Sequence, residues 1–354
     1  MNFLLTIILS VFPLMASSNS QIKHLVDEAY RNRLFGSATL TVVNSSTESF
    51  TYSVGESHLQ KIYDIASLTK VVATTTSVMI LEERGEISLR DKVSRYFPDF
   101  RGGEKDSVTV EDLLRHRAGL PAGAALLTDE SFSTYLRRIT RAPLNYRPRS
   151  QTLYSDLSFI LLGRIVELVS RSSLSEFSQT NIFRPLKMSL TTYLVGASNF
   201  SGCAPTSSLA NCWVHDPTAY RLLPLTIGNA GLFSTIQDLS RFCHMVLNKG
   251  VFEGVRILSE ASVSKMATSD GLRGLGWDFT SEYAAPPRGD IFPAGISFGH
   301  TGYTGTTIWI DPASTSFYIF LSNRVYMGDE RTRKPFTEFR KNLSTEIGRS
   351  IYRP

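Results

Sequence analysis

The sequence predicts an α+β fold in which helices flank an antiparallel β-sheet and an all-helical domain is inserted. Strand-like runs with period-2 alternation occur near both ends of the chain, within residues 37–54 and 305–322. The stretch between them, up to about residue 200, consists of helical segments separated by Pro and Gly. The 354 residues are 42% hydrophobic and 19% charged, as in an ordinary globular protein.

The N-terminal elements are a helix and a β-hairpin. A helical pattern covers Ser20–Arg33, and alternating runs follow at Ser37–Val43 and Ser49–Val54. The turn-rich Asn44-Ser45-Ser46 separates these two runs, so we expect paired strands. The apolar run from Asp64 to Glu83 then predicts a long buried helix, because Arg84-Gly85 supplies the glycine expected beyond a helix C-terminus.

Capping patterns mark the later helices, and a second pair of strands follows them. A serine or threonine followed by an acidic or amide residue is typical of a helix N-terminus. The predicted features are an N-cap at Thr109–Asp112, a helix over Leu157–Val169, a capping box at Ser173–Glu176, a helix from Ser234–Gln237 to Gly250, strands at Gly305–Ile310 and Ser316–Ser322 joined through 311–313, and a closing helix at Pro335–Tyr352.

Strands at both ends with helices between them predict a discontinuous domain. We expect residues 19–63 and 205–354 to form the sheet domain, and residues 64–204 to form the helical domain. Clefts at domain boundaries are common ligand sites. Segments distant in sequence would therefore meet at one cleft.

Residues 1–18 have the pattern of a signal peptide. Phe3–Met15 is almost wholly apolar, and Ala16-Ser17-Ser18 provides small residues for cleavage. The apolar run is shorter than the ~20 residues of a membrane span. We therefore expect export to the periplasm or the medium, with no stable membrane span after cleavage. A retained signal anchor is the alternative.

The net charge bears on possible partners, and the three cysteines bear on disulfide bonding. A net charge of +5 without a dense basic block interleaved with aromatics argues against a nucleic-acid partner. In an oxidising compartment, Cys203 and Cys212 are expected to form a disulfide across the intervening loop. Cys243 lies in a helical pattern and is expected to be a small buried apolar side chain.

The tetrad Ser67-Leu68-Thr69-Lys70 is the main candidate for chemistry. A serine hydroxyl is a weak nucleophile until a neighbouring base accepts its proton. Residues three apart share a helix face, so Lys70 can lie beside Ser67. If burial and neighbours lower the pKa of Lys70, its neutral amine can serve as that base. The alternative, a surface pair on an amphipathic helix, is disfavoured by the apolar residues around Ser67 and Lys70.

Other candidate sites are weaker. Gly295-Ile-Ser297-Phe-Gly299 matches a nucleophile elbow, but that motif needs a following helix and a later histidine, and His300 is the last one. The six histidines show no metal-ligand spacing, and no glycine-rich phosphate loop is present, so neither metal nor cofactor is expected. We interpret His215-Asp216 as a structural hydrogen-bonding pair.

Three ordered signatures, Ser67-Leu-Thr-Lys70, Tyr154-Ser-Asp156 and His300-Thr-Gly302, resemble the serine β-lactamase and penicillin-binding-protein superfamily. The chain is most similar to class C β-lactamase-like serine hydrolases, which include low-molecular-weight penicillin-binding proteins, esterases and amidases. The resemblance implies a β-lactamase/transpeptidase-like fold. Supporting phrases are Leu113-Leu-Arg-His-Arg-Ala-Gly-Leu120, Val214-His-Asp216 and Asn229-Ala-Gly-Leu-Phe-Ser-Thr235.

The resemblance also implies roles for individual residues. Ser67 would be the acylated nucleophile, with Lys70 and Tyr154 as proton-transfer partners, either of which could take the serine proton. The backbone N–H groups of Ser67 and Tyr303 would form the oxyanion hole. The residues implied in substrate binding are Asp156, His300, Thr301 and Gly302.

Two departures from the family pattern affect the expected substrate. His300 stands where the family has a lysine, which replaces a permanent cation with a group that titrates near pH ~6.5 when unperturbed. Asp156 stands where many β-lactamases have asparagine. Both changes also occur in esterase-like relatives, and they argue against an efficient β-lactamase.

The expected function is therefore that of an exported serine hydrolase, acting through an acyl-enzyme on a small-molecule or peptide substrate with an ester or amide bond. The alternatives are a D-alanyl-D-alanine carboxypeptidase or β-lactamase and, from another class, a catalytically idle penicillin-recognising or scaffold protein.

Overall fold

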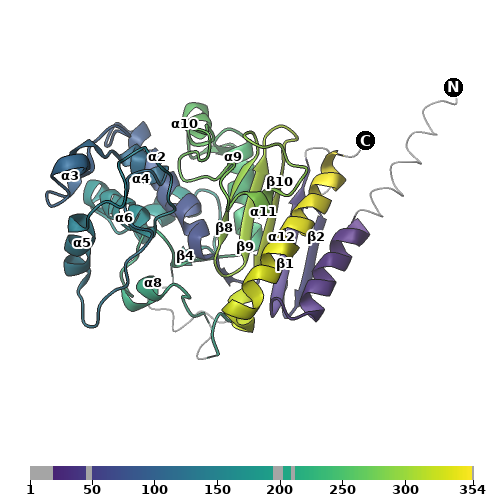
Figure 1. Cartoon of the computed structure of the whole chain (residues 1–354). Coiled ribbons are helices and arrows are strands. Elements are labelled where there is room, and N and C mark those ends of the chain that lie inside the picture. Colours follow the sequence, from purple (N-terminus) through teal and green to yellow (C-terminus); the bar gives the residue numbers. More distant parts are fainter. Residues whose placement is uncertain (1–18, 45–49, 194–201, 209–211, 353–354) are drawn as a thin grey trace, which may run out of the picture.

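The computed structural model describes residues 19–44, 50–193, 202–208 and 212–352 (Figure 1). Its largest sheet has five strands in the order β2-β1-β10-β9-β8, and every neighbouring pair is antiparallel. The predicted α+β class is thereby confirmed. The strands are β1 (Ser37–Val43), β2 (Phe50–Gly55), β8 (Phe298–Gly302), β9 (Thr306–Asp311) and β10 (Ser316–Ser322).

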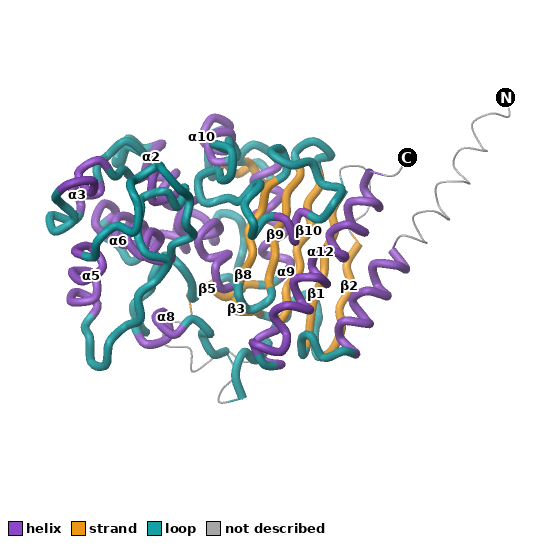
Figure 2. The backbone as a smooth tube through the Cα atoms, in the orientation of Figure 1, coloured by secondary structure: helices purple, strands orange, loops and turns teal. Residues whose placement is uncertain are grey.

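Helices cover both faces of this sheet. A helix over residues 19–31 and α12 (Asp329–Tyr352) lie on one face, and α9 (Ile236–Leu247) lies behind the other (Figure 2). Side chains alternate along each strand, so β10 turns Tyr318 toward α12 and Ile319 toward α9. The sheet is therefore buried on both sides.

A second group of helices lies beside the sheet, at the left of Figure 1. Its members are α2 (Thr76–Glu83), α3 (Val93–Tyr96), α4 (Val110–Leu114), α5 (Phe132–Arg141), α6 (Asp156–Ser170) and α7 (Leu174–Ser178), with short helices at Gly103–Ser107 and Gln179–Phe183. The remaining elements are β4 (Thr192–Tyr193), α8 (Pro217–Arg221), β5 (Leu232–Ser234), β6 (Val251–Phe252), β7 (Val255–Arg256), α10 (Glu260–Met266), α11 (Ala285–Arg288) and a turn of helix at Arg324–Met327.

The expected capping patterns are present at several helices. Thr109 and Ser173 both form complete capping boxes, with Asp112 and Glu176 as their partners. At α9 the cap lies one residue later than the predicted Ser234–Gln237 pattern: Thr235 accepts the N–H of Asp238, because Ser234 belongs to strand β5. The first residue of the predicted strand, Ser49, and part of its preceding turn lie outside the described residues, as do residues 1–18.

The predicted helix over 64–83 is wrong at its start. Tyr63–Asp64 forms strand β3, which pairs with β5. The segment then winds as a 3₁₀ turn, η1 (Ala66–Leu68), a π-helical stretch, η2 (Lys70–Thr75), and finally α2. The Thr76 hydroxyl donates to the carbonyl of Val71, five residues back, which suits the wider π turn.

The closing helix begins six residues earlier than predicted. The sequence suggested Pro335 at its first position, where proline is favoured. The structure begins α12 at Asp329, directly after Gly328, whose φ is +96°. The hydroxyl of Thr332 bonds to the Gly328 carbonyl and closes the first turn, so Pro335 lies within the helix.

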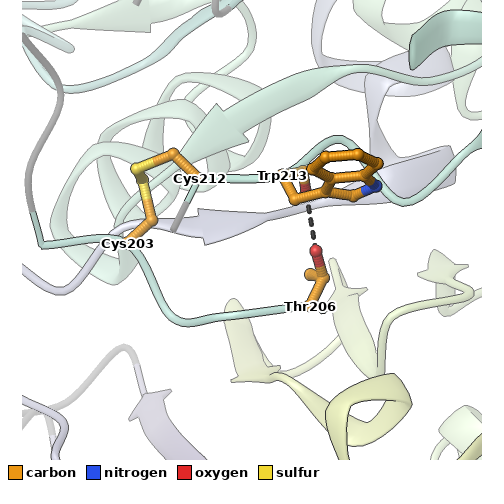
Figure 3. The surroundings of a disulfide bond; sticks show 4 residues. All are labelled: Cys203, Thr206, Cys212 and Trp213. Carbon is orange, nitrogen blue, oxygen red and sulfur yellow. Dashed lines mark hydrogen bonds between the residues drawn. A yellow bond between two sulfur atoms is a disulfide. The ribbon is translucent and has the colours of Figure 1, made fainter. Parts of the chain in front are cut away.

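The predicted disulfide joins Cys203 and Cys212, while Cys243 is free and buried (Figure 3). The N–H of Ala204 donates to Ile62 at 2.7 Å, next to β3. The Thr206 hydroxyl donates to the Trp213 carbonyl at 2.6 Å. The bridge thus connects the start of the nucleophile segment with the stretch that leads to His215.

Within the part of the chain that the structure describes, none of the helices combines the length and the apolar character needed to cross a membrane.

Candidate active site

Ser67 and Lys70 face each other at the centre of the molecule. The Nζ of Lys70 lies 3.0 Å from the Oγ of Ser67. Its other close partners are the carbonyl of Asn229 at 2.9 Å and a carboxylate oxygen of Asp156 at 2.6 Å. The Lys70 side chain is fully buried. The amine is therefore held by three oxygens that arise from three separate segments.

The segment before β5 positions the helix that carries Lys70. The Thr74 hydroxyl donates to the Gly228 carbonyl at 2.7 Å, and the Leu232 N–H donates to the hydroxyl of Thr69. A Cβ at Gly228 would lie 2.1 Å from the backbone oxygen of Phe159 in α6. Glycine is required there because three backbone segments meet at this point.

Tyr154 lies beside the lysine, and His116 holds its backbone. The Nζ of Lys70 is 4.9 Å from the centre of the Tyr154 ring. The Nδ1 of His116 accepts the N–H of Ser155 at 3.0 Å, and the His116 carbonyl accepts the N–H of Leu153. The rings of His116 and Tyr154 are 4.6 Å apart. His116 was part of a supporting phrase, and its positioning role is visible only in the structure.

The surroundings of Lys70 and Tyr154 shift the pKa values of both side chains upward. Burial works to lower the pKa of Lys70, but the interactions with Asp156 and Tyr154 together outweigh it, and the net pKa is raised. Burial raises the pKa of Tyr154, and Lys70 offsets only part of that shift. In the resting site, Lys70 is consequently an ammonium and Tyr154 a neutral phenol. The condition for a neutral resting lysine, a net lowering of its pKa, is not met, because Asp156 lies in direct contact with the amine.

The third signature lies on β8, at the edge of the sheet. The His300 ring is buried and lies 5.9 Å from the Tyr154 ring, and its Nδ1 is 2.9 Å from the carbonyl of Thr301. Burial, with the nearby charges of Arg273 and Lys70, holds the pKa of His300 well below its usual value. It is neutral at pH 7 and does not titrate near 6.5.

The turn after β8 packs directly against the nucleophile segment. A Cβ at Gly302 would lie 2.5 Å from the Ile65 carbonyl oxygen, so only glycine allows this approach. The Thr304 hydroxyl donates to the Asp64 carbonyl at 2.7 Å. Tyr303, between them, is half-exposed, and its hydroxyl bonds to Asp329 and Arg333. The backbone around Tyr303 is thereby held next to Ser67.

Asp64 joins this turn to a third segment. Its carboxylate accepts the N–H groups of Ala66 and His215, each at 2.8 Å. Burial raises the pKa of Asp64 to about 7, although these two hydrogen bonds oppose the shift. The predicted His215–Asp216 pair has other partners: the His215 ring stacks on Tyr303, and Asp216 caps α8.

Arg273 was not recognised from the sequence. Its side chain is 2% exposed, pairs with Asp278 at 2.9 Å, and places its guanidinium carbon 5.4 Å from the Tyr154 ring. Its only sequence signal is a lone charge within the Gly/Leu-rich run 271–276. Arg273 therefore brings a guanidinium, ion-paired with Asp278, into the wall of the site beside Tyr154.

A cavity of about 400 Å³ opens beside Ser67. Besides Ser67 and Tyr154 it is lined by Arg273, Asp278, Tyr283, Pro287, His300, Thr301, Gly302, Tyr303, Trp309, Arg324, Arg333, Phe336, Thr337 and Arg340. The three signatures thus contribute to one cavity wall. Asp156 lies behind it, in contact with Lys70.

The competing nucleophile elbow is excluded by its surroundings. The Ser297 hydroxyl donates to the Pro293 carbonyl, and strand β8, rather than a helix, follows it. Among the described ranges, no three His, Cys, Asp or Glu side chains gather closely enough to hold a metal ion.

Comparison with known proteins agrees with this geometry. The family described as Beta-lactamase matches residues 22–340. A protein of Salmonella agona (strain SL483), named "Putative D-alanyl-D-alanine carboxypeptidase", is 31% identical over 72% of this chain and 68% of its own.

Solved structures show the same fold. EstCE1, described as a hydrolase with promiscuous acyltransferase activity, superposes with a TM-score of 0.70 at 17% identity, over 94% of this chain and 98% of its own. An octameric penicillin-binding protein homologue from Pyrococcus abyssi gives a TM-score of 0.68 at 21% identity, over 86% of this chain and 73% of its own.

Proposed function

The chain is a serine hydrolase of the beta-lactamase family, and from this premise we propose that it cleaves ester or amide bonds through an acyl-enzyme on Ser67. The observation that carries the proposal is the contact of 3.0 Å between Ser67 Oγ and a buried Lys70, at the wall of a cavity. A hydroxyl, an amine and a phenol in contact are the parts that nucleophilic catalysis by serine needs.

Acylation begins when Ser67 Oγ attacks the substrate carbonyl carbon. Because Lys70 rests as an ammonium, it first gives up a proton, and Asp156 at 2.6 Å is its nearest acceptor. The serine proton then passes either to the freed amine of Lys70 or to Tyr154, which in that case first gives its own proton to that amine and accepts the serine proton as a phenolate. The N–H groups of Ser67 and Tyr303 stabilise the oxyanion, and losing one such donor typically costs ~3 kcal/mol.

The same two proton-transfer residues, Lys70 and Tyr154, also serve in the second half of the reaction. The leaving group takes its proton from the Lys70–Tyr154 pair as the carbonyl bond to it breaks. Water then attacks the acyl carbon, gives a proton to the same pair and releases the acid, so that Ser67 regains its hydrogen. His300 is neutral and contributes polarity rather than charge.

A D-alanyl-D-alanine carboxypeptidase is the second candidate, favoured by Arg273. Such a substrate ends in a carboxylate, and Arg273 places a permanent cation against Tyr154. Arginine binds carboxylates well through its planar set of donors. The name of the Salmonella relative points the same way. The apolar stretch within residues 1–18 supports export to the periplasm or the medium.

The alternative to a serine hydrolase is a catalytically idle scaffold protein with the same fold. Hydrolysis of p-nitrophenyl esters, abolished in Ser67→Ala, would support the hydrolase. Ser297→Ala is the matched control, since its hydroxyl bonds to a backbone carbonyl away from Lys70, and it should retain activity. Stable labelling by a fluorescent penicillin without ester turnover indicates a penicillin-binding protein. Absence of both labelling and turnover indicates the scaffold.

A further inference from the structure

The cavity beside Ser67 carries an excess of positive charge. Four arginines line it, and Asp278 is the carboxylate in its wall. Asp278 pairs with Arg273, and Asp329, behind the wall, pairs with both Arg324 and Arg333. Arg340 forms no ion pair with any described residue; its Nη2 lies 3.4 Å from the Thr306 carbonyl, and its guanidinium carbon lies 4.9 Å from the centre of the Phe336 ring. Burial lowers the pKa of Arg340 to about 10, so it remains charged at neutral pH.

Several buried nitrogen atoms on the cavity residues have no hydrogen-bond partner. They are the Nε and Nη1 of Arg273, the Nε of Arg340, the Nε1 of Trp309 and the Nε2 of His300. Buried polar groups of this kind are rare, because each lost hydrogen bond costs free energy. The first four are donors, whereas the Nε2 of the neutral His300 is an acceptor, since its Nδ1 lies 2.9 Å from the Thr301 carbonyl. A ligand that satisfied the four donors would have to be rich in acceptors and negatively charged.

These donors lie on both sides of β8. Arg273 is on the side of Tyr154, whereas Trp309 belongs to the apolar cluster that packs under α12, the helix of Arg340. Strand β8 is the last strand of its sheet, and its Gly299 pairs with Asp278 at the outer edge. Residues from both sides of the strand line the same cavity, so one ligand can contact both sides. A Cβ at Gly299 would lie 2.3 Å from the Trp309 ring, so the glycine lets the two approach closely.

The leaving group belongs in this cavity. The leaving group must reach a residue that can donate a proton to it, and of the two proton-transfer residues, Lys70 and Tyr154, it is Tyr154 that lines the cavity. Arg273 and His300 lie against the same Tyr154 ring. A carboxylate close to the scissile bond therefore meets Arg273, and a second one farther along the leaving group meets Arg340.

We propose that the cavity selects substrates whose leaving group carries two carboxylates, such as an acidic amino acid, with Arg273 binding the first and Arg340 the second. The proposal rests on the hydrolysis proposed above. It defines Arg340 as a residue that determines specificity.

Matched thioesters test this selectivity. The N-benzoylglycyl thioesters of mercaptoacetamide, mercaptoacetate and mercaptosuccinate release leaving groups with no, one and two carboxylates. In each, Ser67 Oγ bonds to the acyl carbon, the C–S bond breaks and the sulfur leaves as a thiolate, which a chromogenic disulfide reagent detects. Water then hydrolyses the acyl-enzyme.

In the wild type, kcat/KM should rise at least about tenfold from one carboxylate to two, which corresponds to ~1.4 kcal/mol. Arg340→Gln should remove that ratio and keep the preference for one carboxylate over none. Arg349→Gln on the same helix, outside this cavity, is the matched control and should leave all three rates unchanged. Each ratio is measured on one protein sample, so partial misfolding of a variant cancels.

Two results would overturn the proposal: a wild-type enzyme that does not prefer mercaptosuccinate over mercaptoacetate, or an Arg340→Gln variant with an unchanged preference. Failure of the hydrolase assignment looks different, because then no thioester is cleaved or Ser67→Ala still cleaves them. A second variant, Arg273→Gln with Asp278→Asn, removes both charges of the buried pair and should abolish the preference for one carboxylate over none.

Discussion

At the scale of single residues, the state of the catalytic amine depends on one acidic neighbour. Lys70 is buried, which by itself would favour a neutral amine. The carboxylate of Asp156 at 2.6 Å, together with Tyr154, reverses this preference and raises the pKa of Lys70. We therefore expect the aspartate, which stands where many β-lactamases have asparagine, to act on proton transfer.

A pH–rate profile tests this effect. Asp156 raises the pKa of both Lys70 and Tyr154, so kcat/KM in the wild type should still rise with pH above neutrality. Asp156→Asn removes that carboxylate, and the rising limb should move to lower pH whichever residue accepts the proton. The measurement is ester hydrolysis between pH 5 and 11. If the rise of kcat/KM occurs at the same pH in Asp156→Asn as in the wild type, neither Lys70 nor Tyr154 controls it.

At the scale of elements, the geometry around Ser67 depends on how closely segments approach. The π-helical stretch η2, the segment before β5 and α6 meet at Gly228, where even one methyl group has no space. Overpacking of this kind typically costs about 1–3 kcal/mol, and here it would displace the carbonyl of Asn229 that holds Lys70.

Gly228→Ala should therefore lower both the free energy of unfolding and kcat. Gly123→Ala is the matched control, because a Cβ at Gly123 meets nothing within 4 Å, and it should be close to neutral. Urea denaturation and ester hydrolysis measure the two effects. Equal stability of the two variants would contradict the close approach at Gly228.

The disulfide between Cys203 and Cys212 is a second feature that fixes how segments lie against each other. It closes the short loop from Cys203 to Cys212, and Cys203 is bridged to Ile62 next to β3. Replacing Cys203 and Cys212 with serine should cost about 2–3 kcal/mol of stability, mainly by freeing the unfolded chain. A reductant should lower the denaturation midpoint of the wild type and leave that of the double variant unchanged. A wild type insensitive to reductant would contradict this expectation.

At the scale of the whole molecule, Asp64 connects three distant parts of the chain. Its carboxylate binds the nucleophile segment and the His215 segment, and its carbonyl binds the turn after β8. Because its pKa is raised from 3.8 to about 7, the folded protein takes up a proton between these values that the unfolded chain has lost. Asp64 therefore contributes stability at low pH that is lost as the pH rises through about 7.

Comparing the wild type with Asp64→Asn isolates the contribution of Asp64 to the pH dependence of stability. The comparison is needed because the buried histidines His116 and His300 have lowered pKa values, so their contribution to stability changes with pH in the opposite direction. The stability of the variant relative to the wild type should rise from pH 4 to 7, by up to about 1.4 kcal/mol per pH unit, and then level off. Urea unfolding at several pH values measures it. A constant difference would mean that Asp64 stays ionised throughout.

Local pattern was enough to predict the α+β class, the terminal hairpins, the capping boxes and the three signatures, because periodicity and caps act within a few residues. The start of the nucleophile helix was wrong, since the pairing of β3 with β5 overrides local helical preference at Tyr63–Asp64. The charge of Lys70, the neutrality of His300 and the role of Arg273 depend on groups far apart in sequence. Only packing brings Asp156 to Lys70 and Arg273 to Tyr154, and electrostatic interactions follow distance in space rather than along the chain.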